Sequence, residues 1–122
     1  MGQESRALSP PVTLESGNWF ALYTRHQHER VVSQSLGNKG FTTFLPMYAA
    51  THQWRDRTKL ISLPLFPCYV FVRCTNGADW TRVLATPGIY SVVSFTGQPA
   101  EIPEREIESV RRATESNAHI EP

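Results

Sequence analysis

The segment PLFPCYVFV, residues 64–72, contains the strongest strand signal of the chain in its last four residues, Tyr-Val-Phe-Val. Aromatic and β-branched residues favour strands. Because side chains alternate along a strand, Tyr69 and Phe71 are expected on one face of the sheet. The other face then receives Cys68, Val70 and Val72. Both faces are apolar, which predicts a central strand that is covered on both sides.

Helical and strand patterns alternate on either side of this segment. Strands are expected near residues 19–23, 41–45 and 89–95, and a short helix near 79–85. A candidate hairpin has arms near 48–54 and 59–63, with its tip at 55–57. The order of elements predicts an α+β fold: a mainly antiparallel sheet of about four strands, with flanking helices and a protruding β-hairpin.

The two longer helices have recognisable end signals. Thr24 is expected to open the first helix, with Gln27 completing a capping box and Gly40 ending the helix in a left-handed conformation. Val32 and Leu36 would form its buried stripe. The last helix is expected to follow Pro103, with acidic residues in its first turn and arginines near its end, as the helix dipole favours.

Length and composition fit one folded domain. The chain has 122 residues and a net charge of +1. Residues 1–17 show no usable periodicity and are expected to be a leader, 18–114 the folded domain, and 115–122 a tail. No apolar run approaches the roughly 20 residues of a membrane helix, and the first residues lack the order of a signal peptide, so a cytoplasmic location is expected.

The residue types needed for catalysis or metal binding are present but badly spaced. Two of the four histidines, His26 and His28, lie two positions apart, which puts them on different faces of a helix. Cys68 and Cys74 would be about 20 Å apart in one strand, too far to form a disulfide with each other. We therefore expect two core thiols, no metal, no cofactor and no enzymatic activity.

Two features remain open when only the residues are considered. The face with Tyr69 and Phe71 is either an exposed apolar patch or is covered by the short helix that contains Trp80. Basic residues concentrate near the first helix and at the hairpin tip, beside the aromatic Trp54. They suit either phosphate contacts with base stacking or a merely solvated surface. They are Arg25, His28, Arg30, Arg55, Arg57 and Lys59.

Over about residues 18–112 the chain resembles the N-terminal (NGN) domain of the NusG family of transcription elongation factors. The resemblance depends on the order and spacing of several short segments. They are WFALYTR (19–25), Glu29, Val32, FLP (44–46), WRDR (54–57), PLFPCYVFV (64–72), Trp80, PG (87–88) and PAEIP (99–103). Several of these segments are less similar to housekeeping NusG than to the specialised paralogues of the RfaH and UpxY types, which are operon-specific antiterminators. Cys68 stands where housekeeping members carry glycine.

The resemblance implies a non-enzymatic protein that binds RNA polymerase across its cleft and raises processivity. It places the contact with the clamp helices of the beta-prime subunit at Tyr23, Phe66, Pro67, Tyr69 and Phe71. Trp80 and Thr81 correspond to the side that faces the gate loop of the beta subunit. The six basic residues named above correspond to surfaces that approach nucleic acid, including the non-template DNA strand.

The resemblance also implies a monomer without membrane contact, and a linker from residue 115 toward a KOW domain that this chain does not contain. The alternative from a different class is an RNA-binding module of the RRM type, because Tyr-Val-Phe-Val resembles an RNP1 core. The Lys/Arg-Gly start of that motif is missing, since Pro67 and Cys68 stand there. The bulky Val70 also occupies a position where a small residue would let RNA approach.

Overall fold

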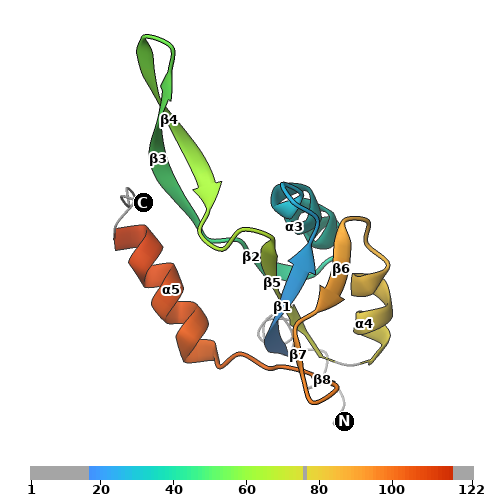
Figure 1. Ribbon diagram of the computed structural model, residues 1–122. Coiled ribbons are helices and arrows are strands. Elements are labelled where there is room, and N and C mark those ends of the chain that lie inside the picture. Colours follow the sequence, from blue (N-terminus) through green and yellow to red (C-terminus); the bar gives the residue numbers. More distant parts are fainter. Residues whose placement is uncertain (1–16, 76, 117–122) are drawn as a thin grey trace, which may run out of the picture.

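The computed structural model describes residues 17–75 and 77–116, so the expected leader, up to residue 16, and residues 117–122 of the expected tail lie outside the described residues. Figure 1 shows the arrangement of the elements. In chain order they are β1 (Asn18–Thr24), α3 (Glu29–Asn38), β2 (Thr42–Phe44), β3 (Met47–Trp54), β4 (Arg57–Pro64), β5 (Tyr69–Cys74), α4 (Gly77–Leu84), β6 (Ile89–Val92), β7 (Ser94–Phe95), β8 (Gln98–Pro99) and α5 (Glu104–Ser116). Helix α5 thus extends two residues beyond the expected end of the domain at 114.

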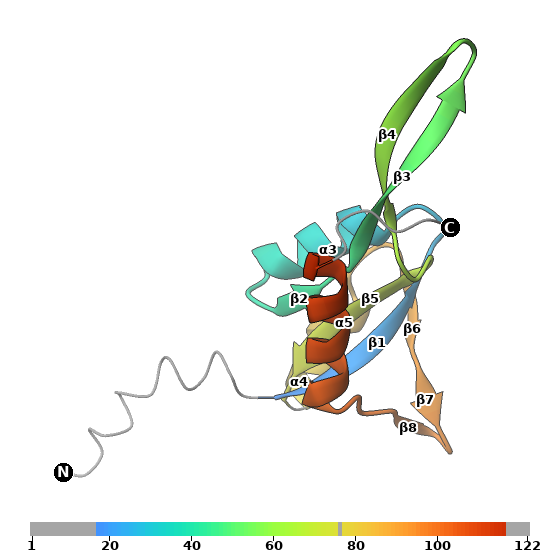
Figure 2. The same ribbon diagram turned by 90° about the vertical axis from the view of Figure 1, so that its left-hand side faces the viewer.

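The predicted α+β fold is confirmed. Strands β2-β5-β1-β6 form a four-stranded sheet in which every neighbouring pair is antiparallel. Strand β5 lies between β1 and β2, which confirms the central position expected from its two apolar faces. Helices α3 and α4 lie on one side of the sheet and α5 on the other (Figures 1 and 2).

The hydrophobic core lies between the sheet and the helices α3 and α4. Val70 and Val72 of β5 and Leu22 of β1 are fully buried there, against a stripe on the helices. That stripe consists of Val32 and Leu36 from α3 and Val83 from α4, all fully buried. Gly40, with φ +96°, ends α3 as expected, and the N–H of Phe41 donates to the carbonyl of Leu36 at 3.0 Å in a Schellman arrangement.

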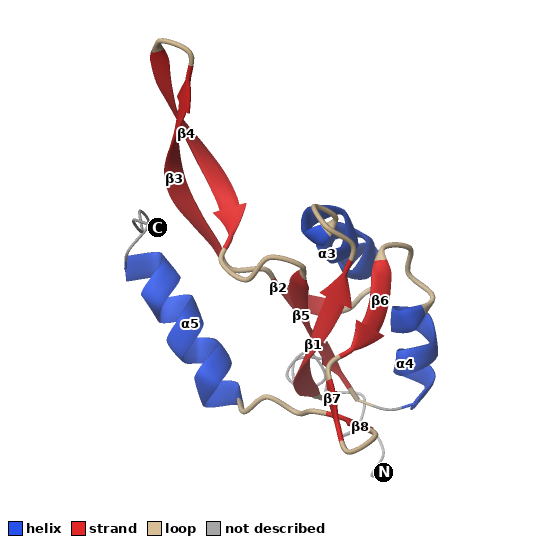
Figure 3. Ribbon diagram, in the orientation of Figure 1, coloured by secondary structure: helices blue, strands red, loops and turns tan. Residues whose placement is uncertain are grey.

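The β3–β4 hairpin projects away from the rest of the fold (Figures 1 and 3). Its strands pair from Met47↔Pro64 to Trp54↔Arg57, and all residues from 51 to 60 are exposed. The expected strand at 89–95 is instead divided into β6 and β7. The last hydrogen bond between this segment and β1 runs from the N–H of Val93 to the carbonyl of Ala21, at 2.9 Å. Beyond Val93 the chain leaves β1, and residues 94–95 pair with β8 instead.

The predicted helix start at Thr24 was wrong. Thr24 is the last residue of β1, is fully buried, and donates its N–H to the carbonyl of Cys68 at 2.9 Å. Gln27 has φ +64°, so the expected capping box does not form and a turn separates β1 from α3. Helix α3 begins at Glu29, after the N-cap residue His28, whose side chain makes no capping hydrogen bond.

Candidate functional site

Five aromatic side chains from four separate parts of the chain lie together on the side of the sheet opposite to α3 and α4. We call them the aromatic patch: Tyr23 of β1, Phe66 of the loop before β5, Tyr69 and Phe71 of β5, and Tyr90 of β6. The ring centroids are 5.6 Å apart for Tyr23–Tyr69 and 5.4 Å for Tyr23–Tyr90. Phe66 packs edge-on against Phe71 at 5.9 Å. These spacings are those of interacting aromatic pairs.

Four of the five rings are substantially exposed. The exposed fractions are 41% for Tyr23, 39% for Phe66, 36% for Tyr69 and 62% for Tyr90. Phe71 is half-buried because its ring is also 6.1 Å from that of Phe44 on the neighbouring strand β2. Phe71 is therefore the base of the patch, and the three tyrosines and Phe66 form its accessible surface. Pro67, also exposed, lies in the turn between Phe66 and Tyr69.

Helix α5 covers only the adjoining part of this face. The Arg73 side chain, 8% exposed, pairs with Glu104 at 2.6 Å and lies over the ring of the buried Trp19. The guanidinium of Arg111 lies 4.6 Å from the centroid of the Phe44 ring. The face thus has one part under α5 and one uncovered part, which is the aromatic patch.

Trp80 does not cover Tyr69 and Phe71, so the alternative that placed both residues under its helix is wrong. The Trp80 ring packs edge-on against Phe20, with centroids 4.9 Å apart, and both residues adjoin the core cluster of Val70 and Val72. Trp80 is half-buried and Thr81 exposed. These two residues therefore lie on the opposite side of the sheet from the aromatic patch.

A buried carboxylate fixes the turn that presents Phe66 and Tyr69. Glu29, 5% exposed at the start of α3, accepts a hydrogen bond from the N–H of Cys68 at 2.7 Å. The carbonyl of Cys68 accepts from the N–H of Thr24, so the peptide groups on both sides of Cys68 are held. Cys68 has φ +72°, in the left-handed region that favours glycine.

The six basic residues form two separate groups. Arg25 and His28 lie in the turn before α3, and the guanidinium of Arg30 donates to the carbonyl of Ser62 at 2.7 Å, which joins α3 to the base of the hairpin. The second group, Arg55, Arg57 and Lys59, is exposed at and near the hairpin tip. From Ser62 the strand rises about 10 Å to Lys59 and about 16 Å to Arg57, at roughly 3.3 Å per residue, so the second group lies apart from the first.

Neither a metal-binding cluster nor a disulfide is found in the chain segments that the structure describes. No three His, Cys, Asp or Glu side chains gather there in a way that could hold a metal ion, and both cysteines are free thiols. Cys74 is buried in the core as expected, but the expectation for Cys68 was wrong: it lies in the turn before β5, is only half-buried and has a left-handed φ, so it is not part of the strand. Burial, and secondarily the charge of Asp79, raises the pKa of Cys74 to about 12, so it remains a protonated core thiol. None of the described helices is long and apolar enough to cross a membrane.

Two residues of this site could not be assigned from the sequence: Tyr90 as a member of the patch, and Glu29 as the acceptor that holds the Cys68 turn. Tyr90 joins the patch through the pairing of β6 with β1, a long-range register that no local pattern encodes. Glu29 was a matching position in the resemblance, but its carboxylate acts on Cys68, which is distant in sequence. The available signal for Glu29 was its position in the first turn of the helix, three residues before Val32 on the buried stripe.

Comparison with known proteins agrees with this fold. The family model described as transcription termination factor nusG matches residues 17–111. The transcription termination/antitermination protein NusG of Halalkalibacterium halodurans is 27% identical over 108 residues, which cover 78% of this chain and 61% of that protein. A solved structure on domain interaction in Thermotoga maritima NusG aligns with a TM-score of 0.61 and 23% identity, covering 81% of this chain and 58% of that one.

The chain thus spans about three fifths of the length of these relatives. The structural likeness shows the same fold, and the family model extends over most of the chain. The chain therefore belongs to the NusG family of transcription termination and antitermination factors.

Proposed function

We propose that this domain binds RNA polymerase through the aromatic patch, which grips the clamp helices of the beta-prime subunit. The observation that supports the proposal is the gathering of Tyr23, Phe66, Tyr69 and Tyr90 on the part of the sheet that α5 leaves uncovered. Exposed clusters of large apolar rings are rare on surfaces without a partner. A helical partner laid against an apolar surface is a recurrent recognition mode, and aromatic anchors supply much of its energy.

The second polymerase contact is proposed on the other side of the sheet, where Trp80 and Thr81 of α4 would face the gate loop of the beta subunit. The opposite placement of the two surfaces supports this assignment, because a domain that bridges a cleft needs contacts on two sides. Such a bridge would hold the clamp closed, disfavour pausing and raise processivity. The action is mechanical and requires no catalytic group.

Nucleic acid is the third proposed partner. Arg25, His28 and Arg30 near the start of α3 would contact the displaced non-template DNA strand. Arg55, Arg57 and Lys59 of the hairpin would contact nucleic acid separately, since they lie on a different surface. Contacts of this kind suit an operon-specific antiterminator of the RfaH or UpxY type, acting in the cytoplasm as a monomer.

A binding assay with a fragment of the beta-prime subunit that contains the clamp helices tests the proposal. Tyr69→Ala combined with Tyr23→Ala is expected to weaken binding about 10-fold or more, as for hot-spot aromatics. Phe95→Ala is the matched control, because Phe95 is 73% exposed but lies on β7, outside the patch. Unchanged affinity in the double variant would refute the assignment. Salt-sensitive RNA binding with no clamp-helix affinity would favour the RRM-type alternative.

A further inference from the structure

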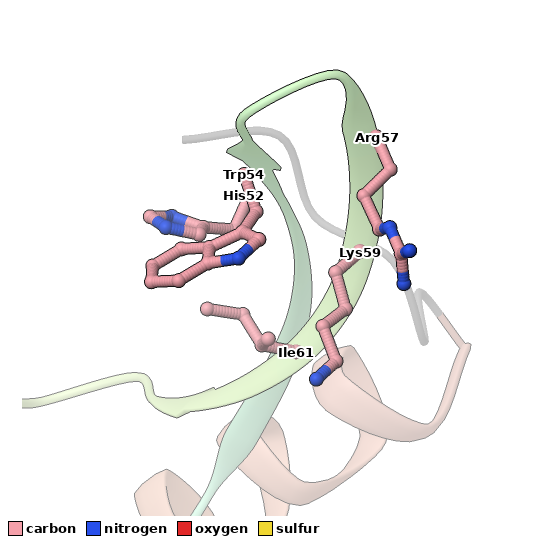
Figure 4. Close-up of a pocket in the computed structure, with 5 residues that line it drawn as sticks. All are labelled: His52, Trp54, Arg57, Lys59 and Ile61. Carbon is pink, nitrogen blue, oxygen red and sulfur yellow. The ribbon is translucent and has the colours of Figure 1, made fainter.

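One face of the projecting hairpin combines two aromatic rings with two cations. Directly paired residues of antiparallel strands point to the same face. The pairs Trp54↔Arg57, His52↔Lys59 and Ala50↔Ile61 therefore share a face. Figure 4 shows the His52 and Trp54 side chains side by side, with Arg57 and Lys59 extending from the facing strand.

The same side chains line a shallow pocket of about 350 Å³, formed by His52, Trp54, Arg57, Lys59 and Ile61. The His52 and Trp54 rings are tilted by 37°, with centroids 6.2 Å apart. Trp54 is 57% exposed, whereas Trp19 is buried and Trp80 half-buried. Packing within the domain therefore does not explain a tryptophan at position 54, because more than half of this side chain remains exposed to water.

The other face of the hairpin has a different character. Its pairs Thr51↔Leu60 and Gln53↔Thr58 carry no charge, and the Thr58 hydroxyl donates to the Gln53 side-chain oxygen at 3.1 Å. The only acidic residue between positions 47 and 64 is Asp56, at the tip. Positive charge and exposed rings are therefore concentrated on one face.

We propose that this face is a binding site for single-stranded nucleic acid, in which Trp54 and His52 stack on bases while Arg57 and Lys59 contact phosphates. This rests on the proposed nucleic-acid contact of the hairpin and adds its ligand class and stacking residues. An indole beside cations matches the bases and phosphates of a single strand. In a duplex the base faces are stacked on one another and not open to an indole. An acidic peptide would satisfy the cations but present no flat partner to the rings.

The test is fluorescence anisotropy with a labelled 12-nucleotide oligothymidylate, the 122-residue chain and its variants. Base stacking is worth about 1–3 kcal/mol per base, so Trp54→Ala should weaken binding at least about 5-fold. Trp54→Phe should retain most of the affinity. Leu60→Ala is the control, because Leu60 is 65% exposed on the other face, and it should leave affinity unchanged.

A second measurement addresses the phosphates. Replacing Arg57 and Lys59 with Gln should reduce the slope of log Kd against log salt by about 1.4, at roughly 0.7 per lost phosphate contact with a single strand. The urea midpoints of all variants establish that each one is folded.

Three results would overturn the inference. They are a 12-base-pair duplex binding as tightly as the single strand, poly-glutamate competing equally well, and Trp54→Ala behaving like Leu60→Ala. Clamp-helix affinity is measured on the same samples. If the wild-type chain binds the clamp helices but not the oligonucleotide, the stacking site alone is refuted. Absent clamp-helix binding in the wild-type chain refutes the polymerase contact instead.

Discussion

Removal of the Glu29 carboxylate should loosen the turn that presents Phe66 and Tyr69. In Glu29→Ala the N–H of Cys68 loses the acceptor that lies 2.7 Å away. Leaving a buried donor unsatisfied costs about 1–3 kcal/mol, and an acidic residue in the first turn of a helix contributes about 0.3–1 kcal/mol more. The expected loss is about 2–3 kcal/mol in the free energy of unfolding. Glu29→Gln keeps an oxygen acceptor and should lose less, about 1 kcal/mol.

Urea denaturation followed by tryptophan fluorescence measures this loss. With an m-value of about 1–1.5 kcal/mol/M, the midpoint of Glu29→Ala should fall by about 1.3–3 M with m unchanged. Glu106→Ala is the matched control, since Glu106 is an exposed acid in the first turn of α5 and its removal affects only the helix dipole. A loss below about 0.5 kcal/mol in Glu29→Ala would mean that the carboxylate does not hold the Cys68 turn, as would equal losses in Glu29→Gln and Glu29→Ala.

Three further predictions concern the same region. Cys68→Gly should stabilise the domain by at most about 1 kcal/mol, because glycine adopts the φ of +72° without strain but loses more conformational entropy on folding. Cys68→Val should destabilise the domain by at least about 1 kcal/mol, because a β-branched residue is strained at this φ. Thermal unfolding compares the two variants. The folded state raises the pKa of Cys74 to about 12 from an ordinary 9.0, so the unfolded state ionises first as the pH rises. The free energy of unfolding should therefore fall by about 1.4 kcal/mol between pH 8 and pH 10 relative to Cys74→Ala, measured by urea unfolding. Tyr90→Ser, at a residue that is 62% exposed, should change the free energy of unfolding by less than 0.5 kcal/mol yet weaken clamp-helix binding; a large stability loss in that variant would mean that Tyr90 serves the fold and not a partner.

Much of the fold was predictable because it depends on local periodicity. The alternation of residues 69–72 identified a central strand, the Val32–Leu36 spacing identified the buried side of α3, and Gly40 identified its end. These signals arise within a few residues of one another. The fold class, the hairpin and the last helix followed from their order along the chain.

Features that depend on long-range pairing were not predictable from the same signals. Thr24 carries a good N-cap side chain, yet its N–H is used by the carbonyl of Cys68, so the strand continues and the helix starts later. Tyr90 joins Tyr23 only because β6 pairs with β1. The sequence likewise left open which part of the Tyr69 face α5 covers, because this depends on where Glu104 and Arg111 meet Arg73 and Phe44.

The division of that face between α5 and the aromatic patch has a consequence for the design of variants. Phe71 contacts both Phe44 under α5 and Phe66 in the patch. Its replacement would therefore disturb packing and binding together. Tyr23, Tyr69 and Tyr90 are better probes, because more than a third of each of these side chains is exposed.

Photo-crosslinking shows whether polymerase occupies the aromatic patch. The photoreactive residue p-benzoylphenylalanine would replace Tyr69, and in a control chain Phe95, in a reconstituted elongation complex. The probe at position 69 is expected to crosslink to the clamp helices of the beta-prime subunit, whereas the probe at position 95 is not. Crosslinks from position 69 to RNA alone, or to no polymerase subunit, would contradict the proposed contact.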